Sequence, residues 1–262
     1  MTDQPLDRPI LYAHRGAAAE QPENTLPSFR RAMELGTDAL ETDVHMTRDG
    51  HLVVSHDPAG LRMCGVDGAI REHTLAEVQS WDAGWGFRDA AGDHPFRGAG
   101  YRMPTLEQVL VEFDGIPINI DLKQKAPPIA LQAIDLIRRV GGEERVTLAS
   151  FSLRTLLEVR RHGYRGPTGM AQAEVAALVF TPRLLFRGLP LTGDAAQLPL
   201  RVGPLRLDTV SLVDKCHSLG IRVDYWTINE PSEAERLLDL GADGIMTDDP
   251  AAIAPVFRAR YG

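Results

Sequence analysis

Short apolar runs rich in β-forming residues alternate with helical patterns along the whole chain. The expected strands lie at 10–15, 39–44, 116–123, 145–150, 167–172, 195–200, 221–228 and 243–248. Helices are expected between most of them, at 24–35, 105–113, 129–140, 152–162, 208–219, 232–240 and from 249 onward. Strands that alternate with helices form parallel sheets. Eight such units in 262 residues predict an α/β fold, a single closed (β/α)₈ TIM-barrel domain over 1–262.

One β-rich run does not fit this alternation. The stretch "ETDVHMTRDGHLVVSHD" (41–57) places a second apolar run only a few residues after a strand, too close for a parallel crossover. We therefore expect a β-hairpin arm on the second strand, with a two-residue Asp-Gly turn at 49–50. In that register His56 lies opposite Asp43, and a bulge would shift the pairing by one residue.

Residues 58–104 form an insertion within the barrel, rich in Gly, Asp and aromatic residues. Only a short helix near 75–81 is expected there. A long irregular segment inside a compact domain is usually functional or disordered. The aromatic residues Trp81, Trp85, Phe87 and Tyr101 favour an ordered, packed insertion.

Residues 174–191 are the most apolar helical stretch, divided by Pro182. One interpretation is a helix of the barrel. The other is an exposed apolar patch that makes a weak contact with a partner or a membrane surface.

The formal net charge of −8 makes general nucleic-acid binding improbable. Cys64 and Cys216 are far apart and match no metal-binding spacing, so two free thiols are expected. The start, "MTDQPLDRPI", lacks the apolar core of a signal peptide, and no run approaches the ~18 apolar residues of a membrane span. We therefore expect a soluble, cytoplasmic protein.

Functional side chains of a barrel gather where its strands end. The first strand ends at His14-Arg15. The second strand carries Glu41 and Asp43, two residues apart and thus on one side of the strand. The third carries Asp121 and Lys123 with the same spacing, and later strands end at Trp226 and at 247–248.

These residue types suit metal-assisted attack on a phosphodiester. Three carboxylates, Glu41, Asp43 and Asp121, are hard oxygen ligands that favour Mg²⁺ or Ca²⁺. Two histidines, His14 and His56, can act as general base and general acid. Arg15 and Lys123 can hold phosphate oxygens. The remaining histidines are assigned structural or surface roles; they are His45, His51, His73, His94, His162 and His217. In the arm, His45, His51 and Arg48 are expected on its solvated side.

Several motifs occur together: "AHRG", "PENT" (22–25), the 41–57 stretch, "NIDLK" (119–123), "WTIN" (226–229) and "GADGIMTDDP" (241–250). As a set they resemble the glycerophosphodiester phosphodiesterase family, over about residues 9–255. The resemblance implies a barrel of the phosphatidylinositol-phospholipase-like group with an insertion after the hairpin. The lack of a signal peptide and the helix at 174–191 resemble the cytoplasmic bacterial branch.

The resemblance also implies a role for each matching residue. His14 and His56 would be the acid–base pair, and Glu41 and Asp43 would bind a divalent cation, Mg²⁺ or Ca²⁺, with Mn²⁺ as a third candidate. The third ligand, commonly glutamate in the family, is here the shorter Asp121. The remaining roles belong to substrate-binding residues: Arg15 and Lys123 at the phosphate, Trp226 against the glycerol or head group, and Asn24 orienting the first loop.

The implied reaction is hydrolysis of a small glycerophosphodiester to glycerol 3-phosphate and an alcohol, by direct water attack or through a cyclic phosphate. Two alternatives remain open at this point. One is a phospholipase-D-like lyase that releases a cyclic phosphate, although such relatives are typically secreted and disulfide-bonded. The other is a non-catalytic barrel that only binds phosphodiesters.

Overall fold

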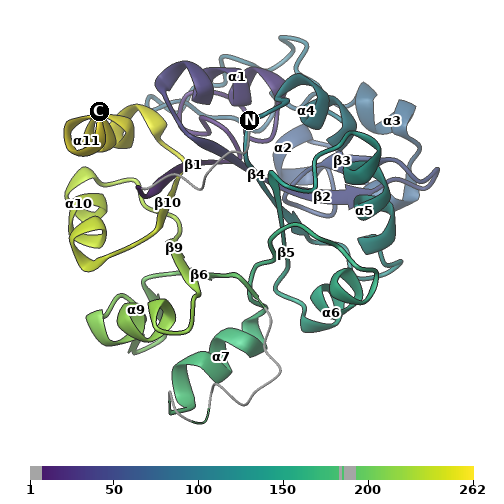
Figure 1. The fold of residues 1–262 in the computed structure, drawn as a ribbon. Helices are drawn as coiled ribbons and strands as arrows, with labels where there is room; N and C mark the ends of the chain where they lie inside the picture. The colour runs from purple at the N-terminus through teal and green to yellow at the C-terminus, as the bar shows by residue number, and fades with distance from the viewer. Residues whose placement is uncertain (1–7, 183–184, 186–192) are drawn as a thin grey trace.

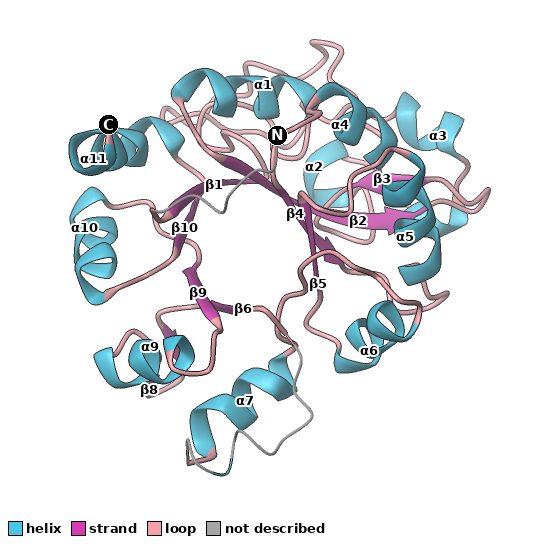
Figure 2. Ribbon diagram, in the orientation of Figure 1, coloured by secondary structure: helices cyan, strands magenta, loops and turns pink. Residues whose placement is uncertain are grey.

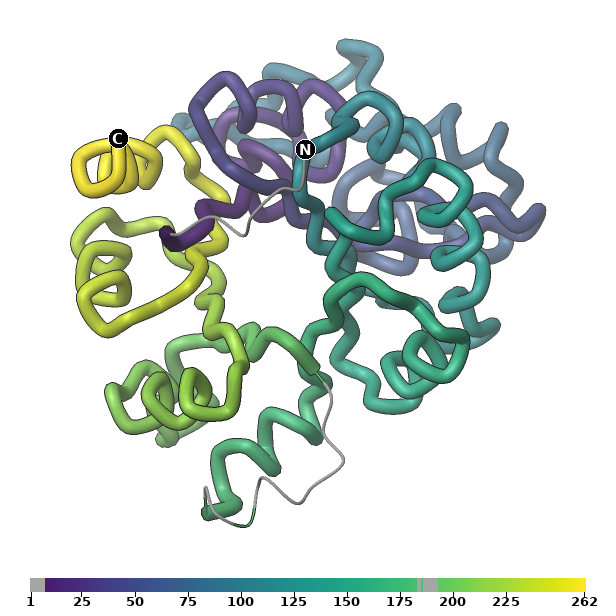
Figure 3. Tube along the Cα trace, in the orientation of Figure 1, coloured from purple at the N-terminus to yellow at the C-terminus, as the bar shows by residue number. Residues whose placement is uncertain are grey.

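The structure, a computed structural model, describes residues 8–182, 185 and 193–262. Seven strands form a parallel sheet in the order β5-β4-β2-β1-β10-β9-β6, and it curls into a ring (Figure 1). These are β1 (Ile10–His14), β2 (Ala39–Met46), β4 (Ile118–Leu122), β5 (Val146–Ala149), β6 (Ala195–Leu198), β9 (Arg222–Tyr225) and β10 (Gly244–Thr247). The chain passes once around the ring, so that β10 pairs with β1 (Figure 3). The α/β barrel class is thus confirmed.

The expected strand at 167–172 is reduced to two isolated bridges. Thr168 pairs with Leu148 of β5, and Gly169 pairs with Ala195 of β6, so this segment completes the ring. Pro167 has no N–H to donate, and helix α7 already begins at Gln172. These two limits leave room for only a few strand-like residues, and the prediction of a full strand here was wrong.

Helices surround the sheet (Figure 2). They are α1 (Leu26–Leu35), α4 (Leu106–Glu112), α5 (Ala130–Arg139), α6 (Leu153–Arg161), α7 (Gln172–Phe180), α9 (Val210–His217), α10 (Pro231–Leu240) and α11 (Pro250–Tyr261). Side chains cap five of their N-termini; they are Thr25, Thr105, Ser152, Thr209 and Asp249. Each expected helix is present to within a few residues. Their apolar faces pack on the strands in two large core clusters.

The first part of the apolar stretch predicted at 174–191 lies in α7, which is a helix of the barrel. Its Leu178 is fully buried, whereas Phe180 near its end is largely exposed. Residues 183–184 and 186–191 of the predicted segment lie outside the described residues. Within the part of the chain that the structure describes, no helix is long and apolar enough to cross a membrane.

The insertion at 58–104 is ordered and has its own small core. It contains α2 (Leu61–Cys64), the 3₁₀ helix η1 (Ile70–Glu72) and α3 (Leu75–Ser80), the last confirming the expected short helix. The buried members of this core are Val53, Cys64, Ile70, Val78, Trp81, Ala83 and Met103. Cys64 and the distant Cys216 are both buried free thiols, as predicted.

The hairpin arm is present, but its register differs from the prediction by one residue. Strand β3 (Leu52–Val54) runs antiparallel to β2, with Val54 opposite Val44. The Thr47 N–H donates to the His51 carbonyl, which leaves a three-residue loop at 48–50 with Gly50 at φ 86°. Such a loop places glycine in the left-handed region and adds one residue to one strand. Consequently Ser55, not His56, lies opposite Asp43 and donates to its carbonyl.

Candidate active site

The predicted site residues of the first strands meet at one end of the barrel. Parallel pairing puts His14 of β1 beside Glu41 of β2, and Asp43 of β2 beside Asp121 of β4. Side chains two residues apart on a strand point the same way, so Glu41 and Asp43 share one side. All three carboxylates are buried.

His14 lies between two carboxylates. Its Nδ1 is 2.6 Å from Oδ1 of Asp248, which follows β10, and its Nε2 is 3.8 Å from Oε2 of Glu41. Burial alone would lower the pKa of His14, but the charges of Glu41 and Asp248 together raise it above its ordinary value. Asp248 therefore orients the ring so that Nε2 faces the carboxylate cluster.

Lys123 lies against two of the buried carboxylates. Its Nζ is 3.0 Å from Asp43 Oδ1 and 2.7 Å from Asp121 Oδ2. Burial opposes ionisation of Asp43, yet Lys123 and Arg15 hold the pKa of that carboxyl below its usual range. Arg15 approaches from the other side, with its Nε 3.3 Å from Asp43 Oδ2. Asp43 is thus an ionised group between two cations.

The other two carboxylates are less well compensated. Burial, together with the charge of Asp43, raises the pKa of Glu41 to about 8, and burial also raises that of Asp121. Glu41 Oε2 and Asp121 Oδ1 are buried and accept no hydrogen bond from the residues that the structure describes. Buried polar atoms without a partner are rare in folded proteins and are found at sites prepared for another group.

The loop after β1 is shaped by two residues with left-handed backbone. Arg15 and Asn24 have φ values of 61° and 57°, uncommon for residues with a Cβ. The Asn24 N–H donates to the Arg15 carbonyl, and its Nδ2 donates to Asp43 Oδ2 over 3.2 Å. Thr42 donates to the amide oxygen of Asn24. Asn24 therefore links the loop after β1 to the carboxylate cluster through these hydrogen bonds.

His56 lies at the end of the arm, where its Nδ1 is 2.7 Å from Asp57 Oδ1. Asp57 in turn accepts a hydrogen bond from Arg62 of the insertion, and Arg62 pairs with Glu23. Burial opposes ionisation of Asp57, but Arg62 and His56 hold the pKa of its carboxyl low. Glu23 also pairs with Arg15, so a chain of ion pairs joins the insertion to the loop after β1.

His45 is not on the solvated side of the arm, and that prediction was wrong. Its side chain is buried, and its Nε2 lies 3.2 Å from the carbonyl oxygen of His56. Burial lowers the pKa of His45, so the ring is held neutral next to the backbone that carries His56. Arg48 and His51 are exposed, as predicted.

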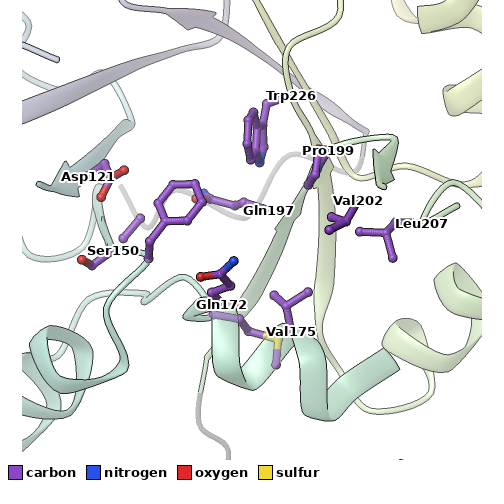
Figure 4. Close-up of a pocket in the computed structure, with 12 residues that line it drawn as sticks. Asp121, Ser150, Gln172, Val175, Gln197, Pro199, Val202, Leu207 and Trp226 are labelled. Atoms are coloured by element: carbon purple, nitrogen blue, oxygen red, sulfur yellow. The ribbon is translucent and has the colours of Figure 1, made fainter. Parts of the chain in front are cut away.

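Trp226 lies on the far side of the barrel mouth, after β9. It contacts Phe151, which follows β5, edge-to-face with ring centroids 6.0 Å apart. Lys123 Nζ is 5.5 Å from the centroid of the Phe151 ring, so Phe151 connects Trp226 with the charged cluster. Phe151, Trp226 and Asp121 line the same pocket, and Figure 4 labels Trp226 and Asp121 at its opening.

The donor chemistry at this cluster fits a hard divalent cation. Glu41, Asp43 and Asp121 are oxygen donors of the kind that Mg²⁺ and Ca²⁺ prefer, and two of them keep an oxygen that accepts no hydrogen bond within the described part of the chain. Among the described residues no three His, Cys, Asp or Glu side chains are already grouped closely enough to hold a metal ion. The Lys123 ammonium occupies the space between two of these carboxylates.

Residues near the site that sequence reasoning did not select share one property: they contact a selected residue. They are His45, Asp57, Phe151 and Asp248. The pairs His56-Asp57 and Thr247-Asp248 were visible at strand ends, but only the fold reveals that each carboxylate contacts the Nδ1 of a histidine.

The sequence matches a model of the glycerophosphoryl diester phosphodiesterase family over residues 14–252. The chain belongs to this family. It is 33% identical over 256 residues to a glycerophosphodiester phosphodiesterase of Caldanaerobacter subterraneus subsp. tengcongensis, a match that covers 95% of this chain and 98% of the relative. A probable glycerophosphodiester phosphodiesterase 2 of Mycobacterium tuberculosis is 31% identical over 257 residues, covering 96% and 91%. The predicted family is therefore confirmed, and with it the prediction of a phosphodiesterase.

Solved structures share the fold at lower identity. A glycerophosphoryl diester phosphodiesterase domain from Mycobacterium tuberculosis superposes with a TM-score of 0.82 at 21% identity and covers 96% of this chain and all of that one. An Oleispira antarctica phosphodiesterase in complex with the product sn-glycerol-3-phosphate gives a TM-score of 0.76 at 24% identity, covering 96% and 97%.

Proposed function

We propose that this enzyme hydrolyses glycerophosphodiesters to sn-glycerol 3-phosphate and an alcohol, with His14 and His56 as the acid–base pair. The observation that carries the proposal is the pairing of each histidine with a carboxylate, 2.6 Å for His14–Asp248 and 2.7 Å for His56–Asp57. A carboxylate on Nδ1 fixes the ring and leaves Nε2 as the nitrogen that exchanges a proton with the reactants. The product named for the Oleispira antarctica structure agrees with this reaction.

Glu41, Asp43 and Asp121 would hold a divalent cation, Mg²⁺ or Ca²⁺. When bound, the cation would polarise the phosphoryl group and stabilise negative charge that develops on its oxygens. The support is the set of buried carboxylates, two of which have an oxygen that accepts no hydrogen bond among the described residues.

Arg15 and Lys123 would bind the phosphate oxygens of the substrate. Both cations already lie at hydrogen-bonding or ion-pair distance from the carboxylate cluster. Each can exchange an acidic partner for a phosphate oxygen without leaving the site. Trp226 would pack against the glycerol or head group, and Asn24 would keep the first loop in place.

The acid–base roles are tested by His14→Ala and His56→Ala, each assayed for glycerol 3-phosphate release from glycerophosphocholine. General acid–base groups contribute roughly 10²–10⁴-fold, so each variant should lose at least about 10²-fold in kcat. His51→Ala is the matched control, because His51 is exposed on the same arm. Undiminished activity in either site variant would overturn the assignment.

The cation is tested by chelation. EDTA should abolish turnover, and a panel of Mg²⁺, Ca²⁺ and Mn²⁺ should restore it to different degrees. Circular dichroism spectra recorded before and after chelation show whether the protein stays folded when the metal is removed. Full activity after exhaustive chelation would remove the cation from the mechanism.

A further inference from the structure

Arg62 of the insertion contacts two carboxylates that come from separate segments of the chain. It belongs to the short helix α2, which lies beside the hairpin arm (Figure 1). Its Nε donates to Asp57 Oδ2 over 2.5 Å, and its two terminal nitrogens donate to the two oxygens of Glu23 over 2.9 and 2.7 Å. Paired N–H groups fix the orientation of a carboxylate as well as its distance. One side chain therefore joins the end of the arm to the loop after β1.

Each of these two carboxylates also contacts a residue of the proposed reaction. Asp57 uses its other oxygen, Oδ1, to hold His56 Nδ1 at 2.7 Å. Glu23 Oε1 is 3.2 Å from Nη1 of Arg15. Arg62 is thus connected to the proposed acid–base histidine and to the proposed phosphate-binding arginine, in each case through one carboxylate.

The backbone alone does not fix the positions of His56 and Arg15. His56 lies beyond β3, and the pairing of the arm with β2 ends at Ser55, whose N–H donates to the Asp43 carbonyl. Arg15 lies beyond β1 and has a left-handed backbone with φ 61°. An irregular or strained backbone keeps one conformation only where the surrounding contacts determine it. The contacts of Arg62 are of this kind.

The ion pairs of Arg62 are shielded from water more than most surface pairs. The side chain of Glu23 is 15% exposed and that of Asp57 is 27% exposed. Salt screens partly buried pairs less than exposed ones. Without Arg62, the side chain of Glu23 would be left with Arg15, and that of Asp57 with His56, among the partners that the structure describes. Both proposed groups would then pair with carboxylates that have lost their anchor.

We propose that Arg62 is a positioning residue for the proposed reaction: through Asp57 and Glu23 it holds His56 and Arg15 at the spacing that one phosphodiester requires. The role rests on the proposed function and adds a positioning group to it. It also gives the insertion a part in turnover, because the insertion supplies the contact that joins the arm to the first loop. A purely stabilising ion pair would change the melting temperature and leave the kinetic constants as they are.

The first experiment compares two arginines of the insertion. Arg62→Met keeps a long side chain and removes its charge, so kcat/KM for glycerophosphocholine should fall roughly 10²-fold, a loss typical of displaced reacting groups. Arg62→Lys should recover only part of the activity, because one ammonium cannot reproduce the guanidinium contacts. Arg102→Met is the matched control and should leave kcat/KM unchanged, since Arg102 is exposed and donates to the neighbouring Tyr101 carbonyl. Thermal melts ensure that every assay is run far below the melting temperature.

Chemical rescue gives a readout that a change in stability would not move. Arg62→Ala leaves space for a guanidinium ion, so millimolar guanidinium chloride should raise its kcat/KM at least about fivefold, far below the molar concentrations that unfold proteins. Sodium chloride at the same concentration should not raise it. The wild type and Arg102→Met should show no increase with either salt.

The two carboxylates separate the two effects of Arg62. Asp57→Asn should lower kcat about tenfold with KM nearly unchanged, because His56 loses its anchor. Glu23→Gln should raise KM about tenfold with kcat nearly unchanged, because Arg15 loses its anchor. Arg62→Met should do both. Either carboxylate substitution added to Arg62→Met should cause little further loss, since residues of one network are not additive.

The outcomes separate this role from the proposed function. Wild-type kinetic constants in folded Arg62→Met, additive losses in the double variants, or no response to guanidinium overturn the positioning role alone. If Arg62→Met does not fold, Asp57→Asn and Glu23→Gln decide by the same division between kcat and KM.

If the wild type hydrolyses no glycerophosphodiester, the proposed function fails, and calorimetric binding of sn-glycerol 3-phosphate decides the role of Arg62. An affinity about tenfold weaker in Arg62→Met than in Arg102→Met supports the role. Equal affinity in the two variants overturns it.

Discussion

The two halves of the barrel supply different kinds of side chain to the same opening. The half formed by β1, β2, β4 and the hairpin arm carries the histidines, the three carboxylates and the cations of the charged cluster. The half formed by β5, β6 and β9 supplies Phe151, Trp226 and most of the lining of an apolar pocket of about 230 Å³ beside the charged cluster. Asp248 is the exception, because β10 closes the ring next to β1 and delivers it to His14.

This division indicates that bond breaking and substrate choice are separable. Changes in the charged half should reduce turnover of every substrate, whereas changes in the apolar half should alter which substrate is preferred. Substitutions on either side of the boundary test this contrast.

The largest effect is expected for Glu41→Gln. The change removes a proposed metal ligand, so kcat should fall by at least about 10³-fold on all substrates. In EDTA its melting temperature should equal or exceed that of the wild type, because burial already disfavours the ionised carboxylate and raises its pKa. Calorimetry and the coupled assay measure the two quantities. A variant that is active but less stable than the wild type would show that Glu41 has a structural role and is not a metal ligand.

A smaller loss, roughly 10²-fold in kcat, is expected for Asp248→Asn, which weakens the hold on His14. The carboxylate raises the pKa of His14, so its removal should move the His14 limb of the pH–rate profile to lower pH. Asp243→Asn is the control, since Asp243 pairs with His217 at a distance of 2.9 Å outside the proposed site. A profile that does not move would mean that Asp248 has no influence on His14.

Trp226→Ala tests the apolar half. Loss of the aromatic surface should raise KM about tenfold with little change in kcat. Trp85→Ala serves as the comparison, because Trp85 is a partly exposed indole of the insertion. Steady-state kinetics distinguish the cases, and a fall in kcat at constant KM would put Trp226 in the chemical step.

The smallest effect on turnover is expected for Glu174→Gln, a buried glutamate of the apolar half. Unlike Glu41 it is fully partnered, pairing with Arg160 at 2.7 Å and accepting from the Ala171 N–H. Breaking a buried pair costs about 3 kcal/mol, which corresponds to a drop in melting temperature of roughly 6–12 °C. Activity at moderate temperature should be retained. Loss of activity without loss of stability would contradict the division.

The charged half was predictable from sequence because its information is local. Alternation along a strand puts Glu41 with Asp43, and strand order puts Asp121 beside them. The apolar half was harder to predict from the sequence. Its pocket is assembled from five separate segments, and residues such as Val202 and Leu207 carry no pattern that distinguishes pocket from core.

The errors have specific physical causes. An Asp-Gly pair suits a two-residue turn, but here Gly50 belongs to a three-residue loop, so the register moved by one. His45 was assigned to solvent because the insertion that helps to bury the arm is remote from it in sequence. The charged residues next to His45 in the sequence do not indicate that another segment buries it.

The bridges at Thr168 and Gly169 affect where the barrel is expected to open locally. The ring is joined there by one bridge on each side, whereas β2 and β4 share five register pairs. Local opening requires least energy where the fewest contacts break, so the amides of this seam should exchange with solvent faster than those of β2. Ala149 and Met170, on either side of the seam, also line the apolar pocket. Opening of the seam would therefore change the shape of the pocket beside Phe151 and Trp226.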